Sequence, residues 1–224
     1  MRELDVIHEA DDLLVLDKPS GLLCVPGRGA DKQDCLSARA QARWPDALVV
    51  HRLDMSTSGL VLMARGIDMQ RALSEAFASQ KMDKRYEAVV DGLLLGGDRD
   101  GDDKWNEIDA PLGADWPRRP LQMVDFERGK PSLTRWRVRK PLPEHDATLV
   151  ELAPRTGRSH QLRVHLSHIG HTILGDALYA TAAQQQRAPR LMLHATRLAF
   201  AHPFTGAELC FESPSHFEQL MLAP

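Results

Sequence analysis

The side chains best suited to chemistry stand in a short polar run that leads directly into an apolar segment. The run reads His51-Arg52-Leu53-Asp54-Met55-Ser56-Thr57-Ser58-Gly59, and the apolar residues 60–64 follow it. An apolar segment of this kind is typical of a buried strand, so the loop before it stands on a rigid frame. The carboxylate of Asp54 therefore serves either as a cap for the nearby backbone or as a reagent.

A second run of charged and polar residues leads into an expected helix. It reads Arg155-Thr156-Gly157-Arg158-Ser159-His160-Gln161-Leu162-Arg163-Val164-His165-Leu166. We expect Ser159 to cap this helix. Its apolar stripe consists of Leu162, Leu166 and Ile169. Arg163 falls off this stripe, between His160 and Ser167 on the same side of the helix.

Tyr86 is one of two tyrosines in the chain. It lies in residues 84–90, whose aromatic and β-branched content predicts a strand. A tyrosine on a strand is most often a core aromatic with its hydroxyl group bonded at the rim. Taken alone, the residue favours that structural use.

Together these segments resemble the motifs of the RluA-type pseudouridine synthases. His-Arg-Leu-Asp with its Thr-Ser-Gly turn is similar to the catalytic motif, residues 84–88 to the tyrosine motif, and residues 155–165 to the third motif. Lys18-Pro19-Ser20-Gly21 resembles the first motif, which is largely structural. Asp-Trp-Pro-x-Arg-Pro at residues 115–120 and Gly-Lys-Pro at residues 129–131 resemble the short, single-domain members in particular.

The resemblance implies an isomerase that breaks the N1–C1′ bond of a uridine in RNA, turns the uracil and joins C5 to C1′. It implies that Asp54 acts at the sugar as nucleophile, as electrostatic stabiliser or as base at C2′. Arg163 would pair with Asp54 and keep it charged, and Tyr86 would stack on the base and help to remove the C5 proton. The target nucleotide must be flipped out, and Arg52 would fill the vacated stack. The reaction has no net redox change, so we expect no cofactor.

The implied partner is structured RNA. The short members modify both the tRNA anticodon stem-loop and a similar hairpin of 23S rRNA, and a single different rRNA or tRNA site is the alternative. We assign RNA contacts to cationic and imidazole side chains, namely His51, Arg52, Arg118, Arg119, Lys130, Arg158 and His160. Residues 134–139 alternate strictly and place Arg135, Arg137 and Arg139 on one face of a strand. The alternation leaves open whether these three contact RNA or protect a solvated sheet edge.

The composition is that of an ordinary soluble domain. Of 224 residues 43% are hydrophobic and 26% charged, and the formal net charge is −3. The charge is unevenly distributed, because residues 91–109 are acidic and residues 118–140 are basic. Residues 91–109 are also glycine-rich, which predicts a solvated loop. The N-terminus has no apolar signal core, and no apolar run approaches the ~20 residues of a membrane span. Three scattered cysteines give no disulfide framework, which favours a reducing cytoplasm.

The patterns predict strands over residues 13–16, 84–90, 134–139 and 147–153, and helices over residues 34–44 and from Ser159, with a further helix capped by Asp68. The resemblance implies an α+β fold with a mixed, mostly antiparallel central sheet, flanking helices and a catalytic cleft across the sheet. We expect residues 1–224 to form a single catalytic domain, without an S4-type N-terminal domain, and to act as a monomer.

Two other classes of function and a metal site have to be considered. An N-ribosyl hydrolase would also use a carboxylate at C1′, and a non-catalytic RNA-binding module would explain the arginines. Four histidines, His160, His165, His168 and His171, follow each other closely. None of their pairs has the His-x-x-x-His spacing of a helical zinc site, so we expect no metal.

The substitution Asp54→Asn tests the carboxylate directly, because it keeps the shape of the side chain and removes the charge. Isomerisation should fall below detection in single-turnover assays, while RNA binding persists. Product analysis separates the three classes of function, since only the isomerase leaves the RNA chain intact without an abasic site. Retained isomerisation by the Asn variant would contradict the mechanism.

Overall fold

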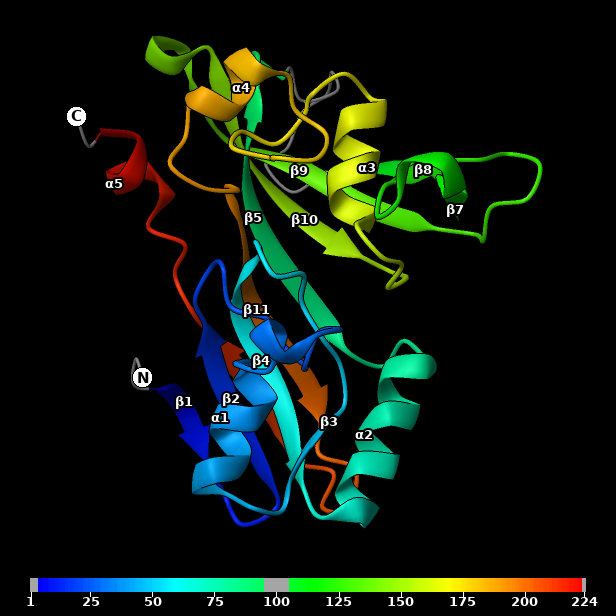
Figure 1. Cartoon of the computed structure of the whole chain (residues 1–224), viewed down its shortest axis with the longest axis vertical. Helices are drawn as coiled ribbons and strands as arrows, with labels where there is room; N and C mark the ends of the chain where they lie inside the picture. The colour runs from blue at the N-terminus through cyan, green and yellow to red at the C-terminus, as the bar shows by residue number, and fades with distance from the viewer. Residues whose placement is uncertain (1–3, 95–104, 223–224) are drawn as a thin grey trace. The chain divides into compact units, whose positions relative to one another are not determined.

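The computed structural model describes residues 4–94 and 105–222 (Figure 1). The chain divides into two compact units. Unit 1 comprises Met1–Lys84 and His194–Ser215, and unit 2 comprises Arg85–Leu193 and His216–Pro224. Asp54 therefore belongs to unit 1, whereas Tyr86 and Arg163 belong to unit 2.

Unit 1 is built on a mixed sheet in the order β1-β2-β4-β11. Its strands are β1 (Asp5–Glu9), β2 (Leu13–Lys18), β3 (Ala47–Val49), β4 (Ser58–Arg65), β11 (Leu193–Ala201) and β12 (Glu208–Glu212). β3 pairs with β4 and β12 with β11, and the pair of β4 with β11 is parallel. β4 is buried along almost its whole length, as its unbroken apolar run predicts. The strand that follows the Asp54 loop thus lies inside the sheet of unit 1.

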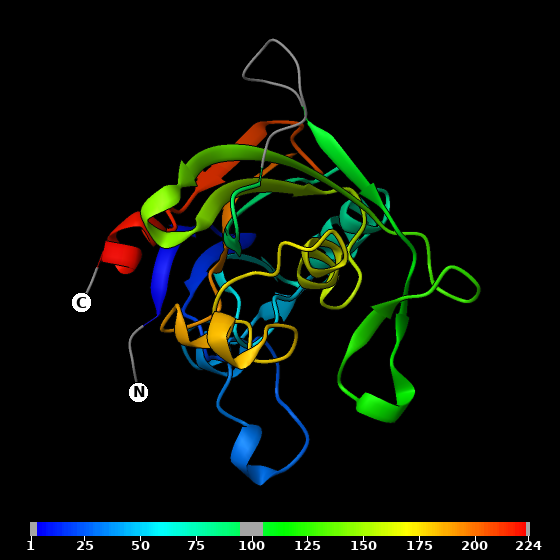
Figure 2. The same ribbon diagram turned by 90° about the horizontal axis from the view of Figure 1, so that it is seen from above.

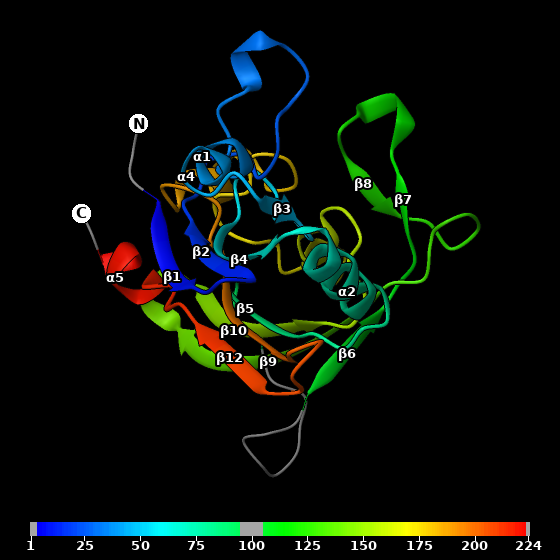
Figure 3. The ribbon, with the colours of Figure 1, turned by 90° about the horizontal axis from the view of Figure 1, so that it is seen from below.

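The helices of unit 1 begin at other residues than their sequence suggests. They are η1 (Ala30–Lys32), α1 (Leu36–Arg43) and α2 (Ile67–Ala78). α2 packs Met69 and Leu73 into a core with Leu60 and Leu62 of β4. The helices and strands of unit 1 can be followed by their labels in Figure 3. The predicted cap at Asp68 is wrong, because α2 starts after Gly66 and Asp68 lies inside its first turn. β1 was not predicted, since only part of its short segment is apolar.

Unit 2 is built on four antiparallel strands in the order β5-β10-β9-β6. They are β5 (Asp83–Asp91), β6 (Asn106–Asp109), β9 (Leu133–Leu142) and β10 (Ala147–Pro154). Figure 2 shows β9 and β10 as long curved strands side by side, and a separate hairpin of β7 (Leu112–Ala114) and β8 (Gln122–Val124). The helices are η2 (Trp116–Arg118), η3 (Pro143–His145), α3 (Gln161–His168), α4 (Ala182–Gln186) and α5 (Phe217–Leu222). The two units together confirm the predicted α+β class and its mixed, mostly antiparallel pairing.

The expected solvated loop at residues 91–109 is described only in part. Residues 95–104 lie outside the described residues, while Asn106–Asp109 form β6. In the described part, Asp91 forms an ion pair with Arg187. Among the helices of the described residues, none is long and apolar enough to cross a membrane.

The arginines of β9 lie on the sheet face opposite to Tyr86. The register places Leu152 of β10 opposite Tyr86, whereas its neighbour Glu151 lies opposite Arg137. Glu151 accepts a 2.7 Å bond from Arg137 and lies 3.7 Å from Arg85 and from Arg139. Since neighbouring residues of a strand point to opposite faces, this shared carboxylate favours a structural use of the β9 arginines over contact with RNA.

Gly59 permits a close approach of two strands in unit 1. It pairs with Ala195 of the parallel strand β11 and has a φ of +108°. A Cβ atom at this position would lie 2.4 Å from the carbonyl oxygen of Ala195 and 2.5 Å from its nitrogen. Only glycine therefore fits directly after the Thr-Ser turn that follows Asp54.

Gly59→Ala should destabilise the protein much more than Gly66→Ala, which is a matched control. Gly66 also has a positive φ, +84°, but an added Cβ would meet no atom within 4 Å. We expect a loss of more than about 3 kcal/mol for Gly59→Ala and about 1–2 kcal/mol for Gly66→Ala, measured by urea unfolding. Equal losses would show that backbone strain alone, without the contact to Ala195, determines the cost.

Candidate active site

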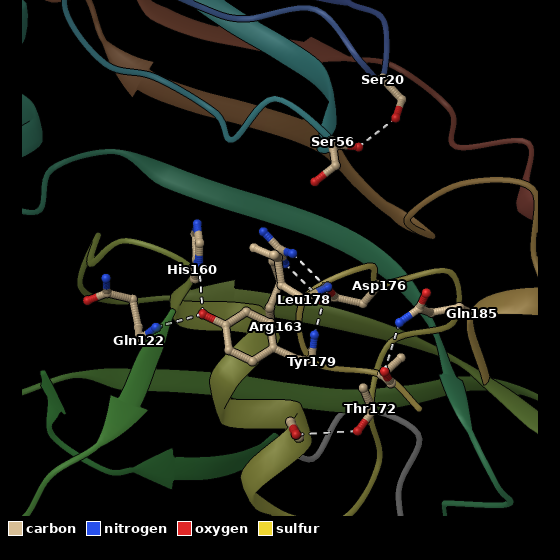
Figure 4. Close-up of polar contacts among 12 residues, drawn as sticks. Ser20, Ser56, Gln122, His160, Arg163, Thr172, Asp176, Leu178, Tyr179 and Gln185 are labelled. Atoms are coloured by element: carbon tan, nitrogen blue, oxygen red, sulfur yellow. Dashed lines mark hydrogen bonds and ion pairs between the residues drawn. The ribbon is translucent and has the colours of Figure 1, made fainter. Parts of the chain in front are cut away.

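The loop that carries Asp54 is held by the turn of the first motif. Lys18 is buried and donates from Nζ to the carbonyl oxygen of Met55 at 3.0 Å, where the amide of Gly21 also donates at 2.8 Å. Ser20 donates from Oγ to the carbonyl oxygen of Ser56 at 2.7 Å (Figure 4). The carbonyl groups of the two residues that follow Asp54 are thereby fixed to a neighbouring segment of the same unit.

The backbone before Asp54 is fixed as well. The amide of Leu53 donates to Sγ of the buried Cys24 at 3.2 Å, and the amide of Thr57 donates to the carbonyl oxygen of Asp54 at 3.1 Å. Burial raises the pKa of the Cys24 thiol, so this sulfur stays protonated and uncharged at neutral pH. Asp54 is half-buried, and the loop backbone is hydrogen-bonded both before and after it, which restricts the position of its carboxylate.

His51 has a structural use that its motif did not predict. Its Nε2 accepts a bond from the amide of Leu62 in β4 at 2.9 Å, and its ring stacks on Phe77 at 4.4 Å between centroids. Burial, with a smaller contribution from the charge of Lys84, lowers the pKa of His51 to about 3. The ring is therefore neutral and carries its proton on Nδ1. Its assignment to RNA binding stays a prediction, while Arg52 beside it is exposed.

The helix of the third motif begins one residue later than predicted, because its cap position is His160 instead of Ser159. His160 lies in the left-handed region at φ +55°, and its side chain makes no capping bond. Gln161 organises this end instead. Its Oε1 accepts from the amide of Arg158 at 3.0 Å, and its Nε2 donates to the carbonyl oxygen of Leu133 at 3.0 Å. The predicted cap at Ser159 is wrong, because the longer amide side chain of Gln161 bonds both to β9 and to the preceding loop.

Arg163 is buried in spite of its place off the apolar stripe. Its Nε and Nη2 donate to the two carboxylate oxygens of Asp176 at 2.7 and 2.6 Å (Figure 4). Asp176 is fully buried and also accepts from the amides of Leu178 and Tyr179. This partner was missed, because Asp176 lies in an irregular segment beyond the helix, where no periodicity points to it. The predicted pairing of Arg163 with Asp54 stays a prediction.

The other predicted site residues of unit 2 lie as follows. Tyr86 is half-buried on β5 and packs against the core of the unit, which confirms the predicted strand. Arg118 pairs with Asp115, and Arg119 stacks on Trp116 with the guanidinium carbon 3.4 Å from the ring centroid. Lys130 and Arg158 are exposed, whereas Nδ1 of His160 is bonded to the hydroxyl group of Tyr179 at 2.7 Å.

The histidines of the third motif do not gather into a ligand set. The buried His165 is bonded through Nδ1 to Thr134 and through Nε2 to the carbonyl oxygen of Ala110, and burial lowers its pKa. Over residues 4–94 and 105–222, no group of three or more His, Cys, Asp or Glu side chains is arranged to hold a metal ion. His165 thus serves to join α3 to β9.

Acid should destabilise the fold through His51. Its pKa of about 3 lies below its ordinary value of 6.5, so between these values the unfolded chain binds one proton more. The stabilisation is complete above about pH 6.5 and is lost as the pH falls, at about 1.4 kcal/mol per pH unit. His51→Gln keeps an acceptor for Leu62 and does not titrate, so its unfolding free energy should fall less steeply from about pH 6 to about pH 4. Parallel curves for the two proteins would contradict a neutral imidazole in the folded state.

Comparison with known proteins agrees with the motifs. Residues 12–168 match the family model described as RNA pseudouridylate synthase. The chain is 48% identical over 200 residues to the dual-specificity RNA pseudouridine synthase RluA of Vibrio cholerae, covering 89% of this chain and 78% of that protein. It is 41% identical over 214 residues to the protein of the same name from Escherichia coli strain K12, covering 96% of this chain and 94% of that protein.

Solved structures give the same result for the fold. Human RNA pseudouridylate synthase domain containing 1 matches with a TM-score of 0.75 at 27% identity, over 96% of this chain and 84% of that chain. Human RNA pseudouridylate synthase domain containing 4 matches with a TM-score of 0.70 at 23% identity, over 94% of this chain and 88% of that chain. At this identity the match shows the fold alone. The resemblance found in the motifs is confirmed, and the chain belongs to the RNA pseudouridylate synthase family, whose members are isomerases that act on RNA.

Proposed function

We propose that this protein isomerises one uridine in the tRNA anticodon loop and one in a hairpin of 23S rRNA. The observation that carries the proposal is the likeness to the enzymes of Vibrio cholerae and Escherichia coli named as dual-specificity RNA pseudouridine synthases, which extends over 94% of the Escherichia coli protein. RNA is read mainly in loops whose bases can be splayed out, so two hairpins with similar loops can share one site.

In this proposal Asp54 acts at the sugar. The N1–C1′ bond breaks, the uracil turns, and C5 bonds to C1′; the C5 proton is then lost and N1 recovers a proton, so the product is an isomer. The carboxylate answers the positive character at C1′, as nucleophile, as electrostatic stabiliser or as base at C2′. The bonds that Lys18, Ser20 and Cys24 make to the loop support this role, because a reagent must be held in place.

Arg163 and Tyr86 complete the proposed catalytic set. Arg163 pairs with Asp54 and keeps it ionised in a water-poor site, while its Nε and Nη2 are held by Asp176. Tyr86 stacks on the uracil and helps to take the C5 proton late in the reaction. No redox step and no group transfer to a carrier occur, so the reaction needs no cofactor.

The proposed RNA contacts lie in both units. Arg52 fills the place left by the flipped base, and the remaining contacts come from His51, Arg118, Arg119, Lys130, Arg158 and His160. The exposure of Arg52, Lys130 and Arg158 supports this assignment. We propose further that residues 1–224 work as one catalytic domain and as a monomer, in the cytoplasm, where the three free cysteines stay reduced.

The proposal is tested with two isolated RNAs, a tRNA anticodon stem-loop and the 23S rRNA hairpin. Pseudouridine should form in both, mapped by carbodiimide treatment and primer extension. Binding should weaken steeply with salt, because each phosphate contact adds roughly 0.7–0.9 to the slope of log K against log salt concentration. The Asp54→Asn protein serves as the inactive control.

Each other outcome has a definite meaning. Modification of one RNA alone would make the specificity single, at one rRNA or tRNA site. If the protein modifies intact ribosomal subunits but neither of the two isolated RNAs, recognition by local loop shape is refuted.

A further inference from the structure

Tyr179 ties the β7–β8 hairpin to the segment that follows α3. Its hydroxyl oxygen accepts a bond from the amide of Gln122, the first residue of β8, at 2.9 Å (Figure 4). The same hydroxyl group is bonded to Nδ1 of His160 at 2.7 Å. Because an amide can only donate, the phenolic oxygen is the acceptor in the first bond, and the second bond joins the same hydroxyl group to the imidazole ring. One hydroxyl group therefore joins a strand of the hairpin to the residue at the start of α3.

The same tyrosine is part of the surroundings of Arg163. Its amide donates to Oδ1 of Asp176 at 3.2 Å, and its ring centroid lies 5.1 Å from the guanidinium carbon of Arg163. The Arg163–Asp176 ion pair is buried, so this end of the tyrosine is held firmly. Tyr179 thus connects β8 to the segment that holds this ion pair.

Two short strands alone are marginally stable, so the position of the hairpin depends on its contacts with the rest of unit 2, of which this bond is one. Its tip carries Trp116, which is 68% exposed, with Arg119 stacked on it and the side chain of Arg118 73% exposed. An exposed aromatic ring beside two arginines suits unstacked bases and phosphates. A tip that binds RNA is useful only if its distance from the rest of the site is constant.

We propose that Tyr179 is a positioning residue for RNA binding, whose hydroxyl group sets the place of the β7–β8 hairpin relative to His160 and the Arg163–Asp176 pair. The inference rests on the proposed function and deepens it. In this proposal Tyr179 acts on the hairpin through its bond to Gln122 and does not itself contact the substrate.

Tyr179→Phe removes the hydroxyl group and keeps the ring over Arg163. With the anticodon stem-loop as substrate, KM should rise about three- to tenfold, as expected for two lost hydrogen bonds, while kcat stays within about twofold. Thr148→Val is the matched control, because Thr148 is buried in the same unit and its hydroxyl group also makes two bonds, with the amide of Leu94 and the carbonyl oxygen of Gly92. The control should lower the melting temperature without raising KM. Equal values of KM for the two variants would overturn the proposal.

A second measurement needs no RNA and no activity. Hydrogen exchange of the amides in residues 112–124 should be faster in Tyr179→Phe than in the wild-type protein, and unchanged in Thr148→Val. Unchanged exchange in Tyr179→Phe would overturn the tie to the hairpin, whatever the activity. A wild-type protein that fails to isomerise uridine would instead refute the proposed function, and the exchange rates would still decide the tie.

The coupling to the hairpin tip is tested by adding Arg119→Ala. If Tyr179 acts through the tip, the increase in KM caused by Tyr179→Phe should be smaller in the Arg119→Ala background than in the wild-type protein. Fully multiplicative effects would show that the hydroxyl group acts elsewhere and would overturn the proposal.

Discussion

The buried ion pair of Arg163 and Asp176 is the interaction on which the structure around the third motif depends. Both side chains are removed from water, with 3% and 0% of their surface exposed. Desolvation of two charges is offset only when the geometry is good and the remaining polar atoms are bonded. Here the carboxylate receives two bonds from the guanidinium and two from backbone amides. Removal of either partner would leave an uncompensated buried charge, at a cost of about 3–5 kcal/mol.

Unit 1 uses a buried cation in a related way. Nζ of Lys18 is bonded to three carbonyl oxygens, those of Pro19, Leu22 and Met55. An ammonium group has three donors, and each of these bonds requires a peptide group at a fixed place. The turn of the first motif and the loop of the catalytic motif are thereby joined. In both units a charged side chain that would favour water determines the position of residues that belong to the proposed reaction.

Much of the fold could be predicted from the periodicity of apolar residues, because the strands that were predicted correctly bury their apolar side chains. Thr134 and Trp136 are buried and Arg135 and Arg137 are not, as their alternation predicts. The helix ends were predicted less well, because Asp68 and Ser159 are good caps only when no neighbour competes. Gly66 and Gln161 displaced them, the first through its positive φ and the second through bonds to β9.

The candidate site was predictable where the residues form contiguous motifs. The residues that hold those motifs lie outside them in the sequence, such as Cys24 for Leu53, Leu62 for His51 and Asp176 for Arg163. Such pairs depend on three-dimensional proximity, which one sequence does not contain. The tie between Tyr179 and Gln122 is of the same kind.

A double-mutant cycle of Arg163→Met and Asp176→Asn tests the role of the buried pair most directly. Asn at position 176 can still accept from the amides of Leu178 and Tyr179, so the turn is kept and the charge is lost. Each single variant should lose stability and single-turnover rate, and the double variant should lose less than the sum, with a coupling of at least about 2 kcal/mol in the free energy of unfolding. Additive losses would show that the two side chains act independently and would contradict this account.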